Sequence, residues 1–207
     1  EIDMDGFREI FGIGPARTSG NGVFRGINEI KPGHYAIFSG EGLNTVRYWE
    51  LESRAHTDSY EETVEKVSFL VRDAIIRQMV SDVPICSFLS GGIDSSIVTA
   101  VASGFLNKNG GKLNTFSFDF KDNDIYFMSN TFQPERDRPF VDIMLKKYDL
   151  NHTYLECDES LLAGLLYNAV DAKDLPGMAD IDASLLYFCS LVKVHNKVAL
   201  TGECADE

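Results

Sequence analysis

The sequence predicts an α/β protein in which a mostly parallel sheet carries helices on both faces. Three observations support this prediction. From residue 83 onward, short apolar runs of strand length alternate with longer runs of helical pattern. A glycine pair, Gly91-Gly92, joins one strand-like run directly to a helix-like run. Polar and acidic residues follow two of the strand-like runs, at the strand ends where open α/β sheets bind ligands.

The N-terminal segment, residues 1–52, is rich in glycine and is predicted to be short and β-rich. Its two expected strands, joined by a glycine-containing turn, are 34–38 and 45–51. Residues 53–59 are polar and are expected to form a linker. The linker ends in two overlapping capping-box patterns, one from Asp58 and one from Ser59, and either pattern suits the start of a helix.

Helices and strands are expected to alternate through the rest of the chain. The expected helices are 60–80, 94–106, 138–150, 159–172 and 182–195, and the expected strands are 85–89, 113–120, 152–157 and 198–201. The first of these helices has an apolar stripe that is expected to pack in the core: Val64, Val67, Val71, Ala74, Ile75 and Met79. The helix at 138 has Pro139 in its first turn, which is a favoured position.

Composition argues against several classes of protein. The chain has 207 residues, of which 44% are hydrophobic and 25% charged, as in a globular domain with one core. Its net charge of -13, without a long basic cluster, argues against a nucleic-acid partner. No apolar run has membrane-spanning length and no signal peptide opens the chain, so no membrane partner and a cytoplasmic location are expected. The cysteines form no C-x-x-C pair, which argues against a zinc site: Cys86, Cys157, Cys189 and Cys204.

The segment SGGIDSS, Ser90 to Ser96, has the chemistry of an anion-binding loop. Its glycines permit close backbone approach, and the helix that follows directs its free N–H groups toward the loop. Its polar side chains are Ser90, Asp94, Ser95 and Ser96, and the carboxylate is a candidate magnesium ligand. The alternative is an ordinary strand-to-helix turn, in which the same residue types are common. The order matches neither a Walker A loop nor a dinucleotide fingerprint.

A second acidic segment, TGECADE at 201–207, follows the last expected strand. By composition alone it is a solvated turn. In a parallel sheet its carboxylates Glu203, Asp206 and Glu207 would lie at the same edge as the glycine loop, where they would hold magnesium and supply a base. Asp94 and Asp206 are therefore the candidate magnesium pair.

These motifs carry a resemblance to a known family. Ser90 to Ser96 resembles the pyrophosphate loop, S-G-G-x-D-S, of ATP pyrophosphatases. Together with DLPGMADIDAS (174–184) and TGECADE, it resembles the synthetase domain of glutamine-hydrolysing asparagine synthetases. That resemblance implies a PP-loop, adenine nucleotide alpha hydrolase-like fold. Two positions depart from the family pattern S-G-E-G-x-D-E, since Thr201 replaces serine and Cys204 replaces glycine.

The resemblance also implies a domain organisation. Residues 1–52 resemble the C-terminal part of a glutaminase domain of the class II amidotransferase type, and 60–207 resemble the N-terminal part of the synthetase domain. The family's N-terminal cysteine nucleophile and its later catalytic lysine have no counterpart here. The chain is therefore expected to be a fragment of a larger enzyme and inactive alone. The sequence does not define the oligomeric state, and a homodimer is compatible with it.

The reaction that the resemblance implies uses ATP, Mg²⁺, aspartate, and glutamine or ammonia. The aspartate side chain would attack the α-phosphate of ATP to give β-aspartyl-AMP and pyrophosphate, and ammonia derived from glutamine would then give asparagine. Magnesium would lie at Asp94 and Asp206, and Glu203 would be the base for the attacking amine. The expected ATP and pyrophosphate contacts are Phe88, Leu89, Ser90, Gly91, Gly92, Ile93, Asp94, Ser95, Ser96, Phe118, Thr201 and Gly202.

Several roles have two interpretations. Asp182 either contacts the acceptor or caps a helix. Arg136 and Arg138 either meet phosphates or belong to a solvated loop. Phe88 and Phe118 either contact adenine or only pack in the core. At the level of function, the alternatives are a related amidotransferase for another carboxylic acid and an ATP-binding module without turnover.

Overall fold

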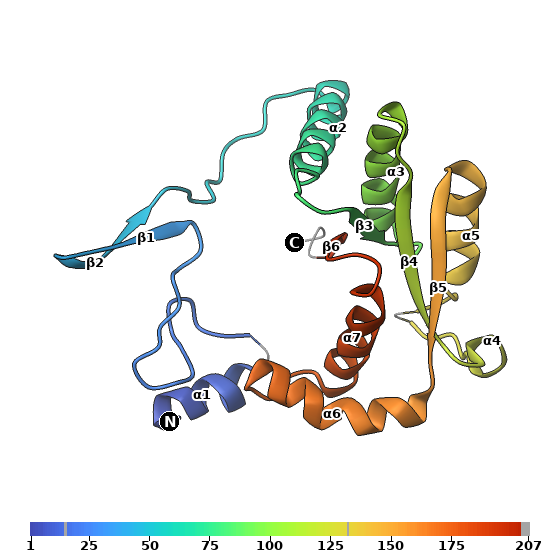
Figure 1. Ribbon diagram of the computed structural model, residues 1–207. Helices are drawn as coiled ribbons and strands as arrows, with labels where there is room; N and C mark the ends of the chain where they lie inside the picture. The colour runs from blue at the N-terminus through green and yellow to red at the C-terminus, as the bar shows by residue number, and fades with distance from the viewer. Residues whose placement is uncertain (15, 132, 204–207) are drawn as a thin grey trace. The chain divides into compact units, whose positions relative to one another are not determined.

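The computed structural model describes residues 1–14, 16–131 and 133–203. Its elements, in chain order, are α1 (Met4–Ile13), β1 (His34–Ser39), β2 (Gly42–Arg47), α2 (Tyr60–Arg77), β3 (Ile85–Phe88), α3 (Ile93–Lys108), β4 (Leu113–Phe120), α4 (Asn123–Tyr126), α5 (Arg138–Lys147), β5 (Leu150–Cys157), α6 (Glu159–Lys173), α7 (Ala179–Val192) and β6 (Val198–Leu200) (Figure 1). The chain divides into two compact units, 1–57 with 170–179 and 58–169 with 180–207.

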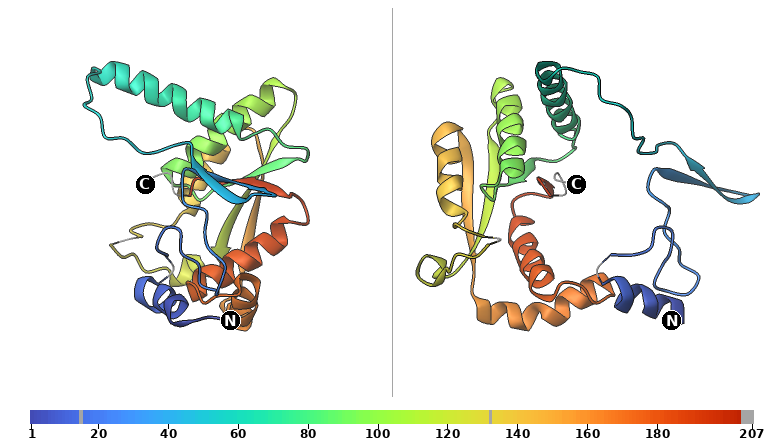
Figure 2. Two further views of the ribbon diagram at one scale, coloured as in Figure 1. Left: turned by 90° about the vertical axis from the view of Figure 1, so that its left-hand side faces the viewer. Right: turned by 180° about the vertical axis from the view of Figure 1, so that it is seen from behind.

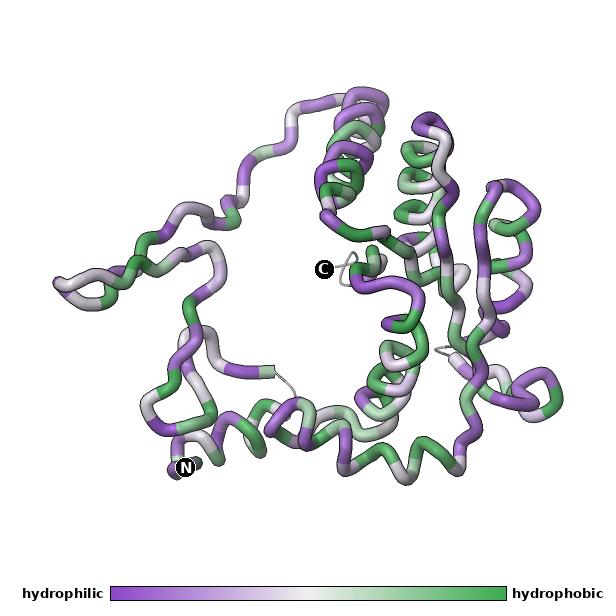
Figure 3. Tube along the Cα trace, viewed as in Figure 1, coloured by the Kyte–Doolittle hydropathy of each residue, from purple (hydrophilic) through white to green (hydrophobic). Residues whose placement is uncertain are grey.

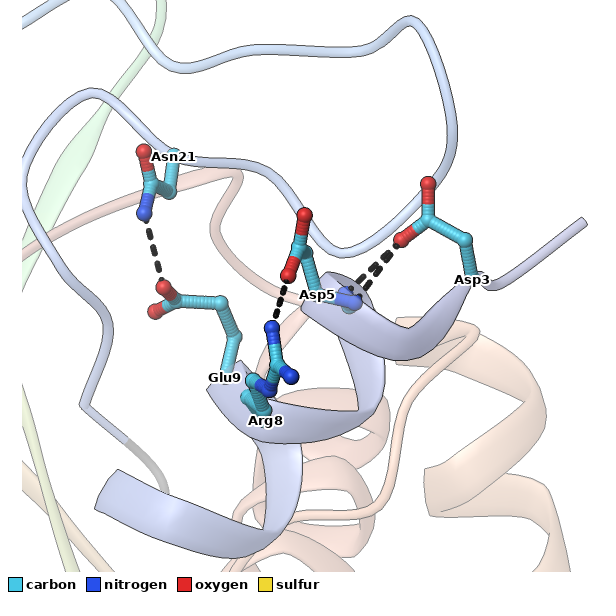
Figure 4. Close-up of polar contacts among 6 residues, drawn as sticks. Asp3, Asp5, Arg8, Glu9 and Asn21 are labelled. Atoms are coloured by element: carbon cyan, nitrogen blue, oxygen red, sulfur yellow. Dashed lines mark hydrogen bonds and ion pairs between the residues drawn. The ribbon is translucent and has the colours of Figure 1, made fainter.

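The first unit begins with α1, a helix that the sequence analysis did not predict. Asp3 caps it, because its carboxylate accepts bonds from the N–H groups of Asp5, at 3.1 Å, and of the next residue, at 3.0 Å. The buried carboxylate of Glu9 accepts a bond from the Thr18 N–H at 2.8 Å. It accepts another from the Asn21 side chain at 2.8 Å, which Figure 4 shows. The Asn21 bond is the main reason why the pKa of Glu9 lies below its usual value. Glu9 thus binds the loop after α1 to the helix.

The first unit also contains the expected hairpin. β1 and β2 pair antiparallel, with His34 opposite Arg47. The second strand, predicted at 45–51, begins earlier and ends at Arg47. Beyond it the N–H groups of Tyr48 and Trp49 both donate to the Gly33 carbonyl, at 2.8 and 3.2 Å, so the one-to-one pairing of the ladder stops there.

The second unit is built on a four-stranded sheet in the order β5-β4-β3-β6. All pairs in it are parallel, with Phe88 beside Phe116 and Ser87 beside Leu200. Consecutive parallel strands need crossover connections, which α3, α5 and the pair α6 and α7 supply. The carboxyl ends of all four strands therefore lie at one edge, and the predicted α/β class with a parallel sheet is confirmed.

Helices cover both faces of this sheet, as Figures 1 and 2 show from three sides. Alternate strand residues enter the cores on the two faces of the sheet. The core beneath α7 contains Cys86, Phe116, Phe188 and Val192. The cores on the other face, beneath α3 and α5, contain Leu89, Ala102, Leu113, Val141, Met144 and Leu200. The carboxyl edge of the sheet is thus held from both sides.

The helix α2 begins at a capping box centred on Ser59 rather than on Asp58. Ser59 Oγ accepts a bond from the Glu62 N–H at 3.2 Å, and the Glu62 carboxylate accepts one from the Ser59 N–H at 2.9 Å. The latter bond is the main reason why the pKa of Glu62 is lowered. The structure thus decides between the two patterns that the sequence left open.

The predicted core packing is wrong for most of the apolar stripe of α2. Ile75 is buried and Met79 packs against the core, but Val64, Val67 and Val71 are 49%, 53% and 38% exposed, and Ala74 is exposed as well. α2 contacts α3. Along α2, hydrophobic and hydrophilic residues alternate (Figure 3). The apolar stripe therefore packs into the core of the second unit only near its C-terminal end.

Some element bounds differ from the prediction. α5 ends at Lys147 rather than 150, because Tyr148 adopts an extended conformation with φ -120° and ψ 143°. β5 then begins at Leu150 rather than 152. The short helix α4 was not predicted. Among the described residues, no helix has the length and apolar character needed to span a bilayer.

Candidate functional site

The loop at 90–92 joins the end of β3 to the start of α3. Leu89, just before it, is buried and donates its N–H to the Phe116 carbonyl at 2.9 Å. The Ser117 hydroxyl donates to the Leu89 carbonyl. Because both backbone groups of Leu89 bind β4, the point at which the loop leaves the sheet is fixed.

Gly91 is required by the protein's own packing. Its φ is +85°, a left-handed conformation that favours glycine. A Cβ at this position would lie 2.8 Å from Phe140 Cβ and 2.9 Å from the Asp137 carbonyl oxygen. Gly91 therefore allows the loop to pack directly against the start of α5.

Gly92 has a different environment. Its φ of -65° and ψ of 163° suit most residues, and a Cβ there would meet only Ser90 Oγ, at 3.5 Å. As the N-cap of α3 it has no side chain to accept bonds from the first turn, whereas Asp3 and Ser59 cap α1 and α2. The space beside Gly92 and the N–H groups of that turn are thus available to an anion.

The Ser95 hydroxyl closes the loop from inside. It is buried, accepts a bond from the Ser90 N–H at 3.2 Å, and donates to the Gly92 carbonyl at 3.2 Å. Ser90 Oγ lies 3.0 Å from it. Because a hydroxyl has one proton, this bonding leaves Ser95 no second donor for a ligand. The expected contact between Ser95 and ATP stays a prediction. Ser90, in contrast, is exposed.

The end of β6 lies against the first turn of α3. A Cβ on Gly202 would be 2.5 Å from the Ser95 nitrogen and 2.9 Å from Asp94 Cβ, so only glycine permits this approach. The next residue, Glu203, lines the same cavity as Ser90. Two motifs that are far apart in the sequence therefore meet at one edge of the sheet.

A cavity of about 370 Å³ lies at the carboxyl ends of β3, β4 and β5. Phe88, Phe118 and Phe188 form an aromatic part of its wall. The Phe188 ring centroid lies 4.6 Å from that of Phe88 and 5.4 Å from that of Phe118. Phe88 and Phe118 therefore pack against the core and also line the cavity.

Another part of the wall is acidic. Asp119 accepts bonds from the Phe120 N–H at 2.9 Å and the Asn123 amide at 2.6 Å. Burial raises the pKa of Asp137, and the neighbouring charge of Asp119 raises it further. Arg138 is the one basic side chain among the described residues of this wall.

The structure brings most predicted site residues to this edge. Those that line the cavity are Phe88, Leu89, Ser90, Phe118 and Glu203. Those in the loop and the first turn of α3 are Gly91, Gly92, Ile93, Asp94, Ser95 and Ser96, and those directly after β6 are Thr201 and Gly202. Asp206, the second predicted magnesium ligand, and Glu207 lie outside the described residues.

Asp94 is the described member of the predicted magnesium pair. Its carboxylate is half-buried in the first turn of α3, and its Cβ is next to Gly202. Within the part of the chain that the structure describes, no group of three or more His, Cys, Asp and Glu is arranged to hold a metal. A single carboxylate such as Asp94 fits Mg²⁺ where phosphates supply further ligands, because Mg²⁺ is usually held by one or two carboxylates together with phosphates.

Asp182 does not cap a helix. α7 begins at Ala179, so Asp182 lies inside the helix and the capping interpretation is wrong. It is half-buried and is absent from the described wall of the cavity. Its contact with the acceptor stays a prediction.

The sequence analysis did not assign a role to several cavity residues: Asp119, Asn123, Gln133, Asp137, Tyr154, Leu185 and Phe188. They come from β4, β5, α7 and the segment between β4 and α5. The predicted strands offered a signal for two of them, Tyr154, which pairs with Ser117, and Asp119, which lies near the carboxyl end of β4. The other five lie on helices or on the segment between β4 and α5, and their places depend on how those parts pack.

Fold and site together define an α/β protein with a glycine loop and a helix N-terminus without a side-chain cap at the carboxyl edge of a parallel sheet. A sequence model described as asparagine synthase matches residues 66–207. The chain belongs to the asparagine synthase family.

Known proteins resemble the chain to different degrees. It is 50% identical over 207 residues to the glutamine-hydrolyzing asparagine synthetase 3 of Bacillus subtilis, covering 100% of this chain and 34% of that protein. It is 29% identical over 203 residues to the amidase chyE of Penicillium rubens, covering 92% of this chain and 30% of that protein. A crystal structure of an NAD+ synthetase from Burkholderia pseudomallei aligns over 69% of this chain and 62% of that one, with TM-score 0.38 and 16% identity, too distant to carry an argument. The chain spans about a third of the length of the curated relatives it matches.

Proposed function

We propose that the protein containing this chain forms the amide of asparagine from aspartate, ATP and ammonia derived from glutamine. One observation carries the proposal. The uncapped first turn of α3 and the Gly202-Glu203 turn lie in direct contact beside one cavity. This arrangement offers donors for a pyrophosphate and a carboxylate for proton transfer at the same place.

The order of chemical steps follows from the poor reactivity of a carboxylate. Direct attack by ammonia would have to expel oxide. When the aspartate carboxylate first attacks the α-phosphate of ATP, pyrophosphate leaves and β-aspartyl-AMP forms. Ammonia then attacks the activated carbonyl, and AMP leaves as a much weaker base.

The loop would bind the departing pyrophosphate. The N–H groups of Gly92, Ile93 and Asp94 are close to the positive end of the α3 dipole. The Ser96 hydroxyl would add a donor, and the Ser90 hydroxyl would do so on turning away from Ser95 Oγ, while Ser95 holds the loop in shape. Mg²⁺, held by Asp94 and by Asp206 as we predict, would neutralise phosphate charge when bound.

Glu203 would be the general base. It lines the cavity directly after Gly202, so it lies near the loop that would bind the phosphates. A carboxylate there is suited to accept a proton from the attacking amine. Adenine would occupy the aromatic part of the cavity, beside Phe88 and Phe118.

The test uses the intact protein with Mg²⁺, ATP and glutamine, with and without aspartate, and separates the nucleotide products. AMP and pyrophosphate that appear only with aspartate, together with asparagine, are the expected result. Formation of ADP and phosphate would contradict α-phosphate attack. Turnover with a different carboxylic acid but not with aspartate would move the protein to a related amidotransferase activity.

A further inference from the structure

Arg138 occupies a distinctive place in the cavity. It is the first residue of α5, whose start packs against Gly91 of the loop. Among the described residues of the cavity wall it is the one cation, and the other charged side chains there are Asp119, Asp137 and Glu203. A polyanionic ligand in this cavity therefore meets one positive side chain amid three acidic ones.

The ring of Tyr154 holds the Arg138 guanidinium in place. The Arg138 Cζ lies 4.3 Å from the centroid of the Tyr154 ring, within cation–π range. The Tyr154 hydroxyl donates to Asp142 Oδ1 at 2.8 Å, and the His152 ring packs edge-on at 4.4 Å between centroids. The tyrosine is thus fixed on two sides, and its face is presented to the arginine.

The electrostatic surroundings keep this arrangement unchanged near neutral pH. Burial, followed by the bond to Asp142, raises the pKa of Tyr154 to about 12, so the phenol stays protonated and continues to donate. Burial lowers the pKa of His152, so no second cation is added beneath the ring near neutral pH.

Among the described residues, no strong ion pair competes for Arg138. Arg138 pairs with Glu156 at 3.9 Å, and the two side chains are 47% and 57% exposed. Exposed pairs at that separation contribute little. The guanidinium is therefore oriented by an aromatic ring while its N–H donors are not saturated by carboxylates.

From this geometry we infer that Arg138 binds a phosphate oxygen of the nucleotide and that Tyr154 is its positioning residue. The inference rests on the proposed function, because it takes ATP to be the ligand of the cavity. A guanidinium is suited to this role, since it keeps its charge and presents several donors in one plane.

The first experiment measures Arg138→Gln in the intact protein. We expect the KM for ATP to rise roughly 10- to 100-fold, as for loss of a charge-assisted hydrogen bond, with the KM for aspartate unchanged. Lys147→Gln is the matched control, because it removes a positive charge from the same helix and a cation–π contact with Tyr148, 5.7 Å away, outside the cavity wall. It should behave like the unmodified protein.

The second experiment tests positioning. Tyr154→Phe keeps the ring and should retain most of the ATP affinity, whereas Tyr154→Leu should raise the KM for ATP while leaving kcat nearly unchanged. In the double variant Tyr154→Leu with Arg138→Gln, the two effects should not add, because both act on one interaction. Additive effects, or a loss in kcat alone, would overturn the positioning role.

Binding of Mg²⁺ with α,β-methylene-ATP, measured by calorimetry, distinguishes a failure of the Arg138 inference from a failure of the proposed function. If the unmodified protein makes AMP and pyrophosphate but Arg138→Gln binds the analogue equally well, the Arg138 inference fails and the proposed function stands. If no AMP forms with aspartate but Arg138→Gln weakens binding of the analogue, the proposed function fails and the phosphate contact stands. A rise in the KM for aspartate alone would also overturn the inference.

Discussion

At the scale of single residues, Gly91 and Gly92 are neighbours with opposite requirements. Gly91 has a left-handed φ and contacts the start of α5, whereas the backbone of Gly92 suits any residue. We expect Gly91→Ala to cost about 1–3 kcal/mol of unfolding free energy, because it adds backbone strain and a clash. Gly92→Ala should change stability by less than about 1 kcal/mol and should weaken nucleotide binding, since its methyl group would occupy the open space beside the helix N-terminus.

Denaturant unfolding and calorimetric titration with Mg²⁺ and α,β-methylene-ATP check both variants. Gly164→Ala in α6 is a control, because a Cβ there would meet nothing within 4 Å. If Gly92→Ala bound the analogue as tightly as the unmodified protein, the nucleotide would have to lie away from the first turn of α3.

Glu203 allows catalysis to be separated from binding. We expect Glu203→Gln to lower kcat for amide formation by about 10²- to 10⁴-fold, because the amide side chain cannot accept the proton. The affinity for ATP should remain nearly unchanged, since the two side chains have similar shape. Steady-state rates of AMP release, compared with calorimetric binding, are the measurement. Glu159→Gln is the control, because Glu159 lies outside the cavity wall. An unchanged kcat in Glu203→Gln would exclude the role of Glu203 as the base.

The residues of the glycine loop were predictable because their order carries chemistry of its own. Gly91, Gly92 and Asp94 stand in a pattern that few strand-to-helix turns share. Arg138 and Tyr154 were not assigned together because the contact between them depends on the packing of α5 beside β5, which no local pattern encodes. The sequence also did not predict that the Ser95 side chain would bond to the backbone of the loop.

At the scale of elements, the start of α2 depends on the Ser59 capping box. We expect Ser59→Ala to lower the free energy of unfolding by about 1 kcal/mol, because the Glu62 N–H loses its partner. The pKa of Glu62 is lowered in the folded state, so its contribution is present above the ordinary carboxylate pKa and is lost as pH falls through the lowered value.

The pH dependence provides the check on this assignment. Glu62→Gln should be less stable than the unmodified protein at pH 7, and the difference should shrink as the pH falls through the lowered pKa of Glu62, because the carboxylate is then protonated. Urea unfolding over a series of acidic pH values and at pH 7 measures this difference. Asp58→Asn tests the rejected alternative, and a larger loss there than in Ser59→Ala would contradict the observed cap.

Element types followed from the sequence more reliably than element ends. The strand at 113–120 was predicted with its observed bounds, because a period-two pattern of apolar residues defines both of its faces. α5 was predicted too long, since its apolar pattern continues through Tyr148 into β5 without a glycine or proline to mark the change. α1 was missed because its glycines suggested a β-rich loop, although the Asp3 cap was present in the sequence.

At the scale of the whole molecule, the site is a consequence of topology. β3 lies between β4 and β6, so the turn after the last strand falls beside the loop after the first strand of the sheet. The predicted parallel sheet was sufficient to place the two motifs at one edge. It was not sufficient to give their contact, which depends on the absence of a side chain at Gly202.

This topology predicts where a bound nucleotide protects the backbone. All the described residues of the cavity wall belong to the second unit. Adding Mg²⁺ with α,β-methylene-ATP to the intact protein should therefore slow amide exchange at 90–96 and 201–203. At a ligand concentration of 100 times Kd, the free energy of the opening reaction that permits exchange should rise by up to about 2.7 kcal/mol. Hydrogen exchange followed by mass spectrometry measures this, with β1 and β2 as the internal reference. Protection confined to only one of the two segments would mean that the ligand does not bridge β3 and β6, and the shared site that their contact implies would then be ruled out.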